Sequence, residues 1–482
     1  MRALRKIGHR AASVTAAFGG ALLLMAAAAS SAFASVTPVT KPQAALPSHD
    51  VAMLHAKILA YLQPYVKSGN FCGSILVVQD GKTLLRDSFG FSDISRQAPN
   101  QVDTKFHIGS LSMQFTAATA MRLVEKGQLS LEMKVSEIVP DVPNGQKITV
   151  RQLLQQNSNL PDANDIPEFD ELLKAHQTPE TLVQFIRGRP PLGQPGGKSQ
   201  GEEHSAYNLL TLIVEKTTGF AFKEAARREV FAPLGMRDSG IDDDSPISPP
   251  LARGYVEKGA VSLAGARQIH WSAKTGNGSA YSTVDDERRW MAGFLSDKFL
   301  SESDRQTMFN DGYGWESLPT SRVGAPIYFM GGQSPFGVSS ELIYIPSLRA
   351  EIVILSNSQI PVPTPMGFDI AAMLAGGEYH DLELKGAVLQ DKSPLLGRYR
   401  FGPDFFRPNA TLEFASSEDG LILKWPGGPD AVVVVADDHH FIDRHYWQKF
   451  SVAEDATGRG QELTYGKFKG QRVSDSAPPS AH

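Results

Sequence analysis

The sequence predicts a mixed α+β fold in which one antiparallel sheet is built from both ends of residues 51–383, followed by a small all-β domain over residues 390–472. Three observations support this prediction. Strand-like runs stand at the start and at the end of the first region, and helical spacing dominates between them. From about residue 394 onward, short β runs are separated by Gly, Pro and Asp, which is typical of a small antiparallel sheet or barrel.

The first 34 residues have the composition of a signal peptide. Basic residues precede an apolar run, and Ala32-Phe33-Ala34 matches a cleavage site. The basic residues are Arg2, Arg5, Lys6 and Arg10. Serines and glycines interrupt the apolar run, which favours cleavage over the alternative of an uncleaved anchor. We therefore expect an exported protein, periplasmic or secreted, with no membrane attachment after cleavage and a Pro/Ala/Thr-rich linker over residues 35–50.

Composition restricts the classes of partner and cofactor. The chain has 482 residues, enough for two or three domains, and its 47 basic and 52 acidic side chains give a net charge of −5. A mildly acidic chain is a poor candidate for binding nucleic acid or an anionic membrane. The single cysteine, Cys72, lies in an apolar run and is predicted to be buried. No Cys/His cluster has zinc-ligand spacing, so we expect neither a metal nor another cofactor.

The N-terminal part of the first region predicts a helix and then a hairpin. The helix covers residues 51–62 and is expected to end there because Pro64 would break it. Residues 73–79 and 82–89 are strand-like runs joined by Asp80-Gly81, a dipeptide that strongly favours a tight hairpin turn.

A serine at the start of a long helix stands out in the middle of the chain. Gly109 frees the backbone before Ser110, and apolar residues with helical spacing follow as far as Gly127. Charge developing near Ser110 would be stabilised by the unsatisfied N–H groups and the positive dipole end of this helix. The alternative is that Ser110 or Ser112 only caps the helix. His107 is interpreted as a packing residue.

The remaining middle region alternates helices with loops. Residues 148–154 and 206–218 predict helices, and a third helix is expected after Ser282, its predicted N-cap. Between the first two helices, residues 188–204 form a long Pro/Gly loop, of a length that is commonly functional in compact domains.

Several short motifs follow one another along the first region. They are Val78-Gln79-Asp80-Gly81-Lys82, residues 108–117, Gly127-Gln128-Leu129-Ser130-Leu131, residues 148–154, residues 231–236, Ser282-Thr283 with Asp286, and Gly331-Gly332. In this order they resemble the serine β-lactamase and penicillin-binding-protein superfamily, specifically the branch with class C β-lactamases, D-Ala-D-Ala peptidases and related esterases. The resemblance implies a β-lactamase/transpeptidase-like fold over residues 51–383 and acyl-serine chemistry on an ester or amide through Ser110. The C-terminal segment resembles the small β domain often appended to such proteins.

All three active-site motifs depart from that family. The first, Ser-x-x-Lys, reads Ser110 to Met113, and methionine cannot accept the serine proton. The second, Tyr-x-Asn, falls on Glu202 and His204. The third, Lys-Thr-Gly or His-x-Gly, becomes Met330-Gly331-Gly332. A literal Lys274-Thr275-Gly276 occurs where the family does not place its third motif, and we interpret it as a chance match.

The resemblance implies which groups remain for chemistry. The family forms its oxyanion hole from backbone N–H groups at the positions of Ser110 and Gln333, beside Gly331 and Gly332, and backbone donors do not depend on side-chain identity. Either Glu202 or His204 would replace the missing base if it lay close to Ser110. The alternative is that these two residues are only the solvated polar end of the Pro/Gly loop.

Two functions follow from these expectations. The first is an exported serine hydrolase with weakened or rerouted base catalysis, acting on a small-molecule or peptide substrate through Ser110. The second is a non-catalytic pseudoenzyme that binds a peptide or cell-wall-derived ligand in the retained cleft, which Met113 and Met330 would make more apolar.

Overall fold

The computed structural model describes residues 48–473, except 166–167, 198–202, 259–261, 320–322, 381–392, 418–419, 427–429 and 437–438. The predicted signal peptide, and the predicted linker as far as residue 47, lie outside the described residues. The chain divides into two compact units, one with residues 30–163 and 170–383 and one that contains residues 384–482. Each unit is described by itself.

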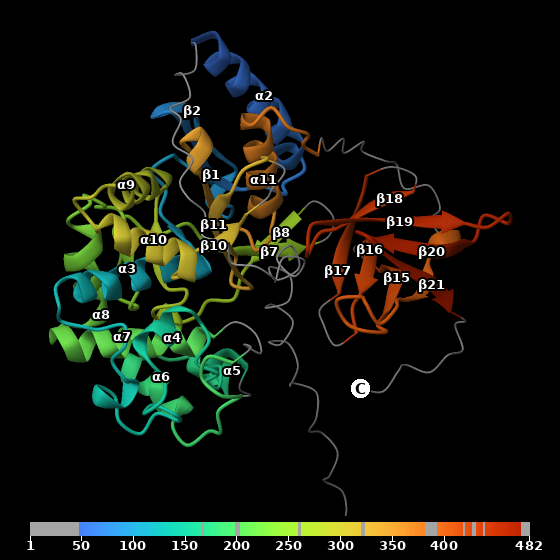
Figure 1. Ribbon diagram of the computed structural model, residues 1–482. Helices are drawn as coiled ribbons and strands as arrows, with labels where there is room; N and C mark the ends of the chain where they lie inside the picture. Colours follow the sequence, from blue (N-terminus) through green and yellow to red (C-terminus); the bar gives the residue numbers. More distant parts are fainter. Residues whose placement is uncertain are drawn as a thin grey trace, which may run out of the picture. The chain divides into compact units, whose positions relative to one another are not determined.

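The first unit is organised on a six-stranded sheet with the order β10-β11-β12-β13-β1-β2 (Figure 1). Its strands are β1 (Gly73–Gln79), β2 (Lys82–Phe89), β10 (Glu316–Leu318), β11 (Ile327–Ser334), β12 (Val338–Ile345) and β13 (Ala350–Ser356). All neighbouring strands run antiparallel, and β1 from the start of the region pairs with β13 from its end. The predicted sheet, assembled from both ends of the domain, is therefore confirmed.

Helices cover the sheet and fill the insertion between its two halves. They are α2 (Ser48–Lys67), α3 (Ser112–Glu125), α4 (Val150–Leu154), α5 (Phe169–Leu172), α6 (Pro179–Ile186), α7 (His204–Thr218), α8 (Phe222–Ala226), α9 (Val284–Phe294), α10 (Glu302–Asp311) and α11 (Pro363–Leu374). Strand β1 is buried along its whole length, because α2 and α11 pack on one side of the sheet and α9 on the other (Figure 1). Helix α3 is buried on nearly every side, which fixes the position of its N-terminus.

Short strands connect the helices. They are β3 (Phe91–Asp93), β4 (Ala98–Pro99), β5 (Phe106–His107), β6 (Gly240–Ile241), β7 (Tyr255–Lys258), β8 (Ser262–Gly265) and β9 (Ala280–Ser282). Strand β9 pairs with both β5 and β6, so the residues before α3 are joined to a segment that is distant in sequence.

Two local predictions were wrong at helix ends. Helix α2 begins at Ser48, inside the predicted linker, and continues through Pro64 to Lys67. Buried packing outweighs the lost backbone hydrogen bond there, since Tyr61 donates from its hydroxyl to Asp369 of α11 at 2.9 Å. Ser282 does not cap α9.

The N-cap of α9 is Thr283, whose side chain accepts from the backbone N–H of Asp286. Ser282 belongs to β9 and pairs with Phe106. Because Ser282 is part of this strand, which the sequence analysis did not predict, the cap falls on the next residue.

The second unit contains a closed antiparallel barrel, which confirms the predicted small β domain. Its strands are β14 (Gly397–Arg400), β15 (Thr411–Ser417), β16 (Gly420–Lys424), β17 (Ala431–Val435), β18 (His440–Asp443), β19 (Gln448–Glu454), β20 (Gly460–Tyr465) and β21 (Phe468–Val473). The barrel closes where β14 pairs with β21. Inside it, the buried carboxylate of Asp443 accepts from Trp425 at 3.1 Å and from Tyr465 at 2.9 Å.

Cys72 is buried, as predicted, and burial raises the pKa of its thiol to about 11. Among the described residues, no helix is long and apolar enough to cross a membrane. No group of His, Cys, Asp and Glu in the same part of the chain is arranged to hold a metal ion.

Candidate acyl-serine site

Ser110 lies in a tight turn between β5 and α3. Residues Gly109–Leu111 form a short 3₁₀ helix, and α3 begins at Ser112. Gly109 has φ = 56°, and a Cβ atom at this position would lie 3.1 Å from the backbone nitrogen of Gln333. Glycine is required here because the backbone is left-handed and a second backbone passes close to it.

The capping interpretation of the two serines is wrong. The N-cap of α3 is Leu111, with no side-chain cap hydrogen bond, and the hydroxyl of Ser112 accepts instead from the backbone N–H of Ala280 at 3.0 Å. Ser110 is half-buried, and its hydroxyl has no hydrogen-bond partner among the described residues. A serine that does not serve the helix end is available for chemistry.

The backbone of β11 lies directly against the Ser110 turn. A Cβ atom at Gly332 would fall 2.0 Å from the carbonyl oxygen of Ile108 and 2.9 Å from the backbone nitrogen of Ser110. Ser340 secures the same contact by donating from its hydroxyl to Ile108 at 2.6 Å. The structure therefore brings the backbones at Ser110 and Gln333 together, as the predicted oxyanion hole requires.

The side chain of Gln333 has a separate role. Its amide donates to the backbone carbonyl of Gln359 at 3.1 Å. This bond holds the side chain toward the end of β13.

Met113 and Met330 were expected to line the cleft, but both side chains are almost fully buried. Their exposed fractions are only 2% and 5%, and both belong to the main hydrophobic cluster of the first unit. The family places a lysine at the first of these positions. Here that space is part of the core, so neither residue moves a proton or supplies charge at Ser110.

The segment predicted to replace Tyr-x-Asn is only partly described, and Glu202 lies outside the described residues. Its neighbour Glu203 is 3% exposed and accepts from Ser158, from both its N–H and its hydroxyl, and from the N–H of Asn159, at 2.6–2.9 Å. Burial raises the pKa of Glu203, although these hydrogen bonds oppose the shift. Its role is to anchor residues 158–159.

His204 starts α7 and is paired with an aspartate that the sequence did not single out. The backbone N–H of His204 donates to Asp162 at 3.0 Å, and its Nδ1 lies 2.9 Å from the same carboxylate oxygen. The side chain of Asp162 is 4% exposed and that of His204 is 19% exposed. A buried carboxylate that orients an imidazole is the arrangement that tunes a general base. No sequence spacing linked these two residues, which are joined only by the tertiary fold.

The Lys274-Thr275-Gly276 match is a loop and not a strand edge. The carbonyl of Gly276 accepts from Thr116 of α3 at 2.7 Å, and that of Thr275 accepts from Asn208 of α7 at 2.7 Å. Met330-Gly331-Gly332, the predicted counterpart of the family's third motif, lies on β11. The loop has a different role, which is to connect α3, the helix that follows Ser110, with α7, the helix that begins at His204.

Comparison with known proteins gives one family. The family model for β-lactamases matches residues 59–373. Among curated proteins, PbpX of Bacillus subtilis is 27% identical over 248 residues, which is 52% of this chain and 61% of that protein. Penicillin-binding protein 4* of the same organism is 26% identical over 318 residues, which is 60% of this chain and 68% of that protein. The chain thus spans about three fifths of the length of PbpX.

Solved structures show the same fold. The octameric penicillin-binding-protein homologue from Pyrococcus abyssi matches with a TM-score of 0.60 and 21% identity, over 87% of this chain and 99% of that one. The D-amino acid amidase from Ochrobactrum anthropi, complexed with L-phenylalanine amide, matches with a TM-score of 0.59 and 20% identity, over 67% of this chain and 98% of that one. Together with the family model, which spans more than half of the sequence, these findings show that the chain belongs to the β-lactamase family of serine hydrolases, in the superfamily that includes the penicillin-binding proteins.

Proposed function

We propose that this protein is an exported serine hydrolase that cleaves an ester or amide by acyl transfer to Ser110. The observation that supports the proposal most is the approach of Gly332 to the backbone nitrogen of Ser110, because two adjacent backbones can supply the N–H groups of an oxyanion hole although the family's side chains have changed. The charge of a tetrahedral intermediate is stabilised by such preorganised N–H groups.

The base in this proposal is His204, oriented by Asp162. Ser110 Oγ attacks the carbonyl carbon and its proton passes to the imidazole, which then protonates the leaving alcohol or amine as the bond to it breaks. Water next attacks the acyl-serine, giving its proton to the same ring, and Ser110 is regenerated with release of the acid. No hydrogen bond joins His204 to Ser110 among the described residues. The proposal therefore requires that substrate binding bring the imidazole within hydrogen-bond reach of Ser110 Oγ. Glu202 remains the second candidate base.

Acyl-enzyme formation tests the proposal directly. Intact mass would be measured after incubation with a fluorophosphonate, a p-nitrophenyl ester, a penicillin and phenylalanine amide, the last because of the amidase among the similar structures. We expect a covalent adduct with at least the fluorophosphonate and the activated ester, lost in Ser110→Ala and kept in Ser130→Ala, a control at an exposed serine.

A pseudoenzyme that binds a peptide or cell-wall-derived ligand is the second candidate. The burial of Met113 in the core favours it, because the family's proton acceptor is absent from that position. Unchanged mass with every reagent, together with a ligand-induced rise in Tm, would support this function over the hydrolase.

A further inference from the structure

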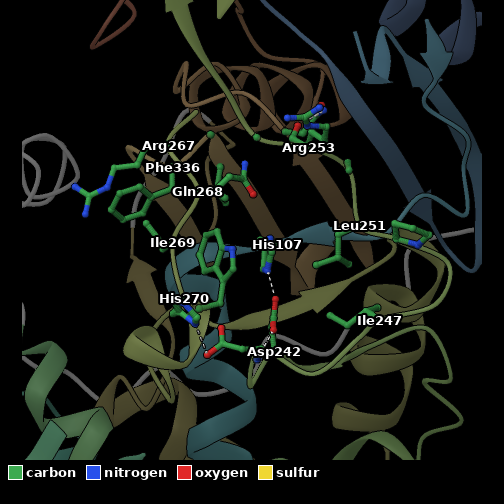
Figure 2. Close-up of a pocket in the computed structure, with 18 of the residues that line it drawn as sticks. His107, Asp242, Ile247, Leu251, Arg253, Arg267, Gln268, Ile269, His270 and Phe336 are labelled. Atoms are coloured by element: carbon green, nitrogen blue, oxygen red, sulfur yellow. Dashed lines mark hydrogen bonds and ion pairs between the residues drawn. The ribbon is translucent and has the colours of Figure 1, made fainter. Parts of the chain in front are cut away.

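A cavity of about 420 Å³ lies beside the nucleophile turn but does not include Ser110 among its lining residues (Figure 2). It is bounded by His107 of β5, by Asp242 after β6, by residues 267–271 and by the turn between β11 and β12. None of Ser110, Gly332 and Gln333 lines the cavity, which is therefore distinct from the candidate oxyanion site.

One polar group of this cavity is the imidazole of His107. Its Nε2 lies 2.9 Å from the Oδ2 atom of Asp242, and the side chains of both residues are 10% exposed (Figure 2). This hydrogen bond places the ring proton on Nε2 and makes Nδ1 an acceptor. Nδ1 has no hydrogen-bond partner among the described residues, so a side chain that lines the cavity and is nine-tenths buried has an acceptor without a donor.

One wall of the cavity is aromatic. The indole of Trp271 stacks on His107 with ring centroids 3.7 Å apart and an interplanar angle of 18°. Phe336 meets the indole edge-on at a centroid distance of 6.3 Å. This wall fits a flat apolar group and adds attraction for a cation near the rings.

The inner charge of the cavity is negative. Asp244 lies 3.0 Å from Nδ1 of His176 and 3.3 Å from Nδ1 of His270, and Asp242 is the second carboxylate. Two arginines also line the cavity, and each is about half exposed and paired with a carboxylate that does not line it. Arg253 lies 3.7 Å from Asp93, and Arg267 lies 2.9 Å from Asp170.

We propose that this cavity binds an organic ammonium ion whose apolar body lies against Trp271 and Phe336. The ammonium donates one N–H to Nδ1 of His107 and is attracted by the carboxylates of Asp242 and Asp244. Buried charge recognition of this kind needs both hydrogen bonding and a compensating charge, and the cavity supplies both. The proposal goes beyond hydrolysis and does not require that Ser110 be reactive.

Three phenyl-bearing probes of similar size but different charge test the proposal. Isothermal titration calorimetry would compare 2-phenylethylamine with the neutral 2-phenylethanol and the anionic 3-phenylpropanoate. We expect the amine to bind at least about tenfold more tightly than the alcohol, and the carboxylate to show no measurable binding. Equal affinity for the three probes, or no binding of the amine, would overturn the proposal.

Variants locate the binding in the cavity. Asp242→Asn is expected to weaken amine binding about tenfold or more, whereas Asp285→Asn, a control at the surface pair with Arg86, leaves it unchanged. Because Asp242 also accepts from the backbone of Asp244, Trp271→Leu provides a second test that leaves this network intact. Amine affinity that is unaltered in both cavity variants would contradict the assignment. Ser110→Ala is expected to bind the amine like the unaltered protein, so failure of the hydrolase proposal is distinguished from failure of this one.

Discussion

The backbone of Gly332 lies against the backbone nitrogen of Ser110, since a Cβ atom on Gly332 would lie 2.9 Å from that nitrogen. This contact brings a strand from the C-terminal half of the domain against a turn from its N-terminal half. The site therefore depends on backbone approach more than on the side chains by which its family is usually identified.

Replacing Gly332 with alanine is expected to separate the two backbones. The new methyl group would fall 2.0 Å from the carbonyl oxygen of Ile108, so β11 must shift and the oxyanion geometry is lost. We expect the rate of Ser110 acylation by a p-nitrophenyl ester to fall about 10²-fold or more. Gly265→Ala, at an exposed glycine with open space around its Cβ position, is the control. Equal rates in the two variants would show that the contact does not support an oxyanion hole.

Asp162→Asn tests the His204 base. If the Asp162 carboxylate orients His204 and stabilises its charged form, the Asp162→Asn variant is expected to acylate about 10²-fold or more slowly. The dependence of its acylation rate on pH should also change. Rates would be measured from pH 5 to pH 9, with Asp297→Asn as a control at an 80% exposed aspartate. A pH profile identical to that of the unaltered protein would assign the base to another group, with Glu202 the next candidate.

Restoring the family's lysine at position 113 is not expected to restore its chemistry. The site is 2% exposed and lies within the main hydrophobic cluster, so Met113→Lys places an amine among apolar side chains. We expect a loss of about 2–4 kcal/mol in the free energy of unfolding and no gain in acylation rate. Urea denaturation would compare this variant with Met53→Lys, at an exposed position of α2. A faster variant of unchanged stability would show that the space is still a proton-transfer site.

Stability is expected to fall as pH rises, because buried carboxyl groups are held neutral. Burial raises the pKa of Glu341 to about 8, and the native state therefore keeps a proton that the unfolded chain releases above its ordinary value of 4.5. The contribution of Glu341 is fully present below pH 4.5 and is lost progressively up to about pH 8. Burial acts in the same direction on Glu287, with a pKa of about 8, and on Glu351, with a pKa of about 7.

Glu341→Gln is the variant that isolates this effect. Between pH 5 and pH 9, the free energy of unfolding of this variant is expected to fall by about 4 kcal/mol less than that of the unaltered protein, because glutamine has no proton to release. Denaturant titrations at several pH values would measure the slope. Glu132→Gln, at a glutamate 69% exposed, should keep the original slope. Parallel slopes for Glu341→Gln and the unaltered protein would mean that Glu341 is ionised in the native state at neutral pH.

The sequence predicted those parts of the structure that depend on local chemistry. Asp80 and Gly81 adopt φ values of 51° and 72°, which is why this dipeptide identified the hairpin correctly. The end of α2 was predicted wrongly at Pro64. The helix continues because Tyr61 is hydrogen-bonded to Asp369 of α11, a residue 308 positions away that no local pattern reveals.

In the candidate site too, some residues belong to local sequence motifs and others are joined only by the tertiary fold. Ser110, Gly332 and Gln333 belong to short motifs, so the sequence predicted them as one group, and their backbones lie close together in the structure. Asp162 was not predicted, since its role follows from a hydrogen bond to a residue 42 positions away. The sequence of Lys274-Thr275-Gly276 indicates only a chance match to the family motif. The loop connects α3 and α7 through its backbone carbonyls, and a motif of side chains does not reveal such contacts.

The segment that follows that loop, residues 277–280, is hydrogen-bonded to both halves of the site. Asn277 donates from its side chain to the carbonyl of His204, and Ala280 joins Ser112 through its N–H and Ile108 through its carbonyl. Local opening of this single segment frees the nucleophile turn and the start of α7 in one event. In native-state hydrogen exchange, the amides of Ile108 and Ala280 are therefore expected to share one opening free energy, and heat inactivation should follow that opening before the sheet melts.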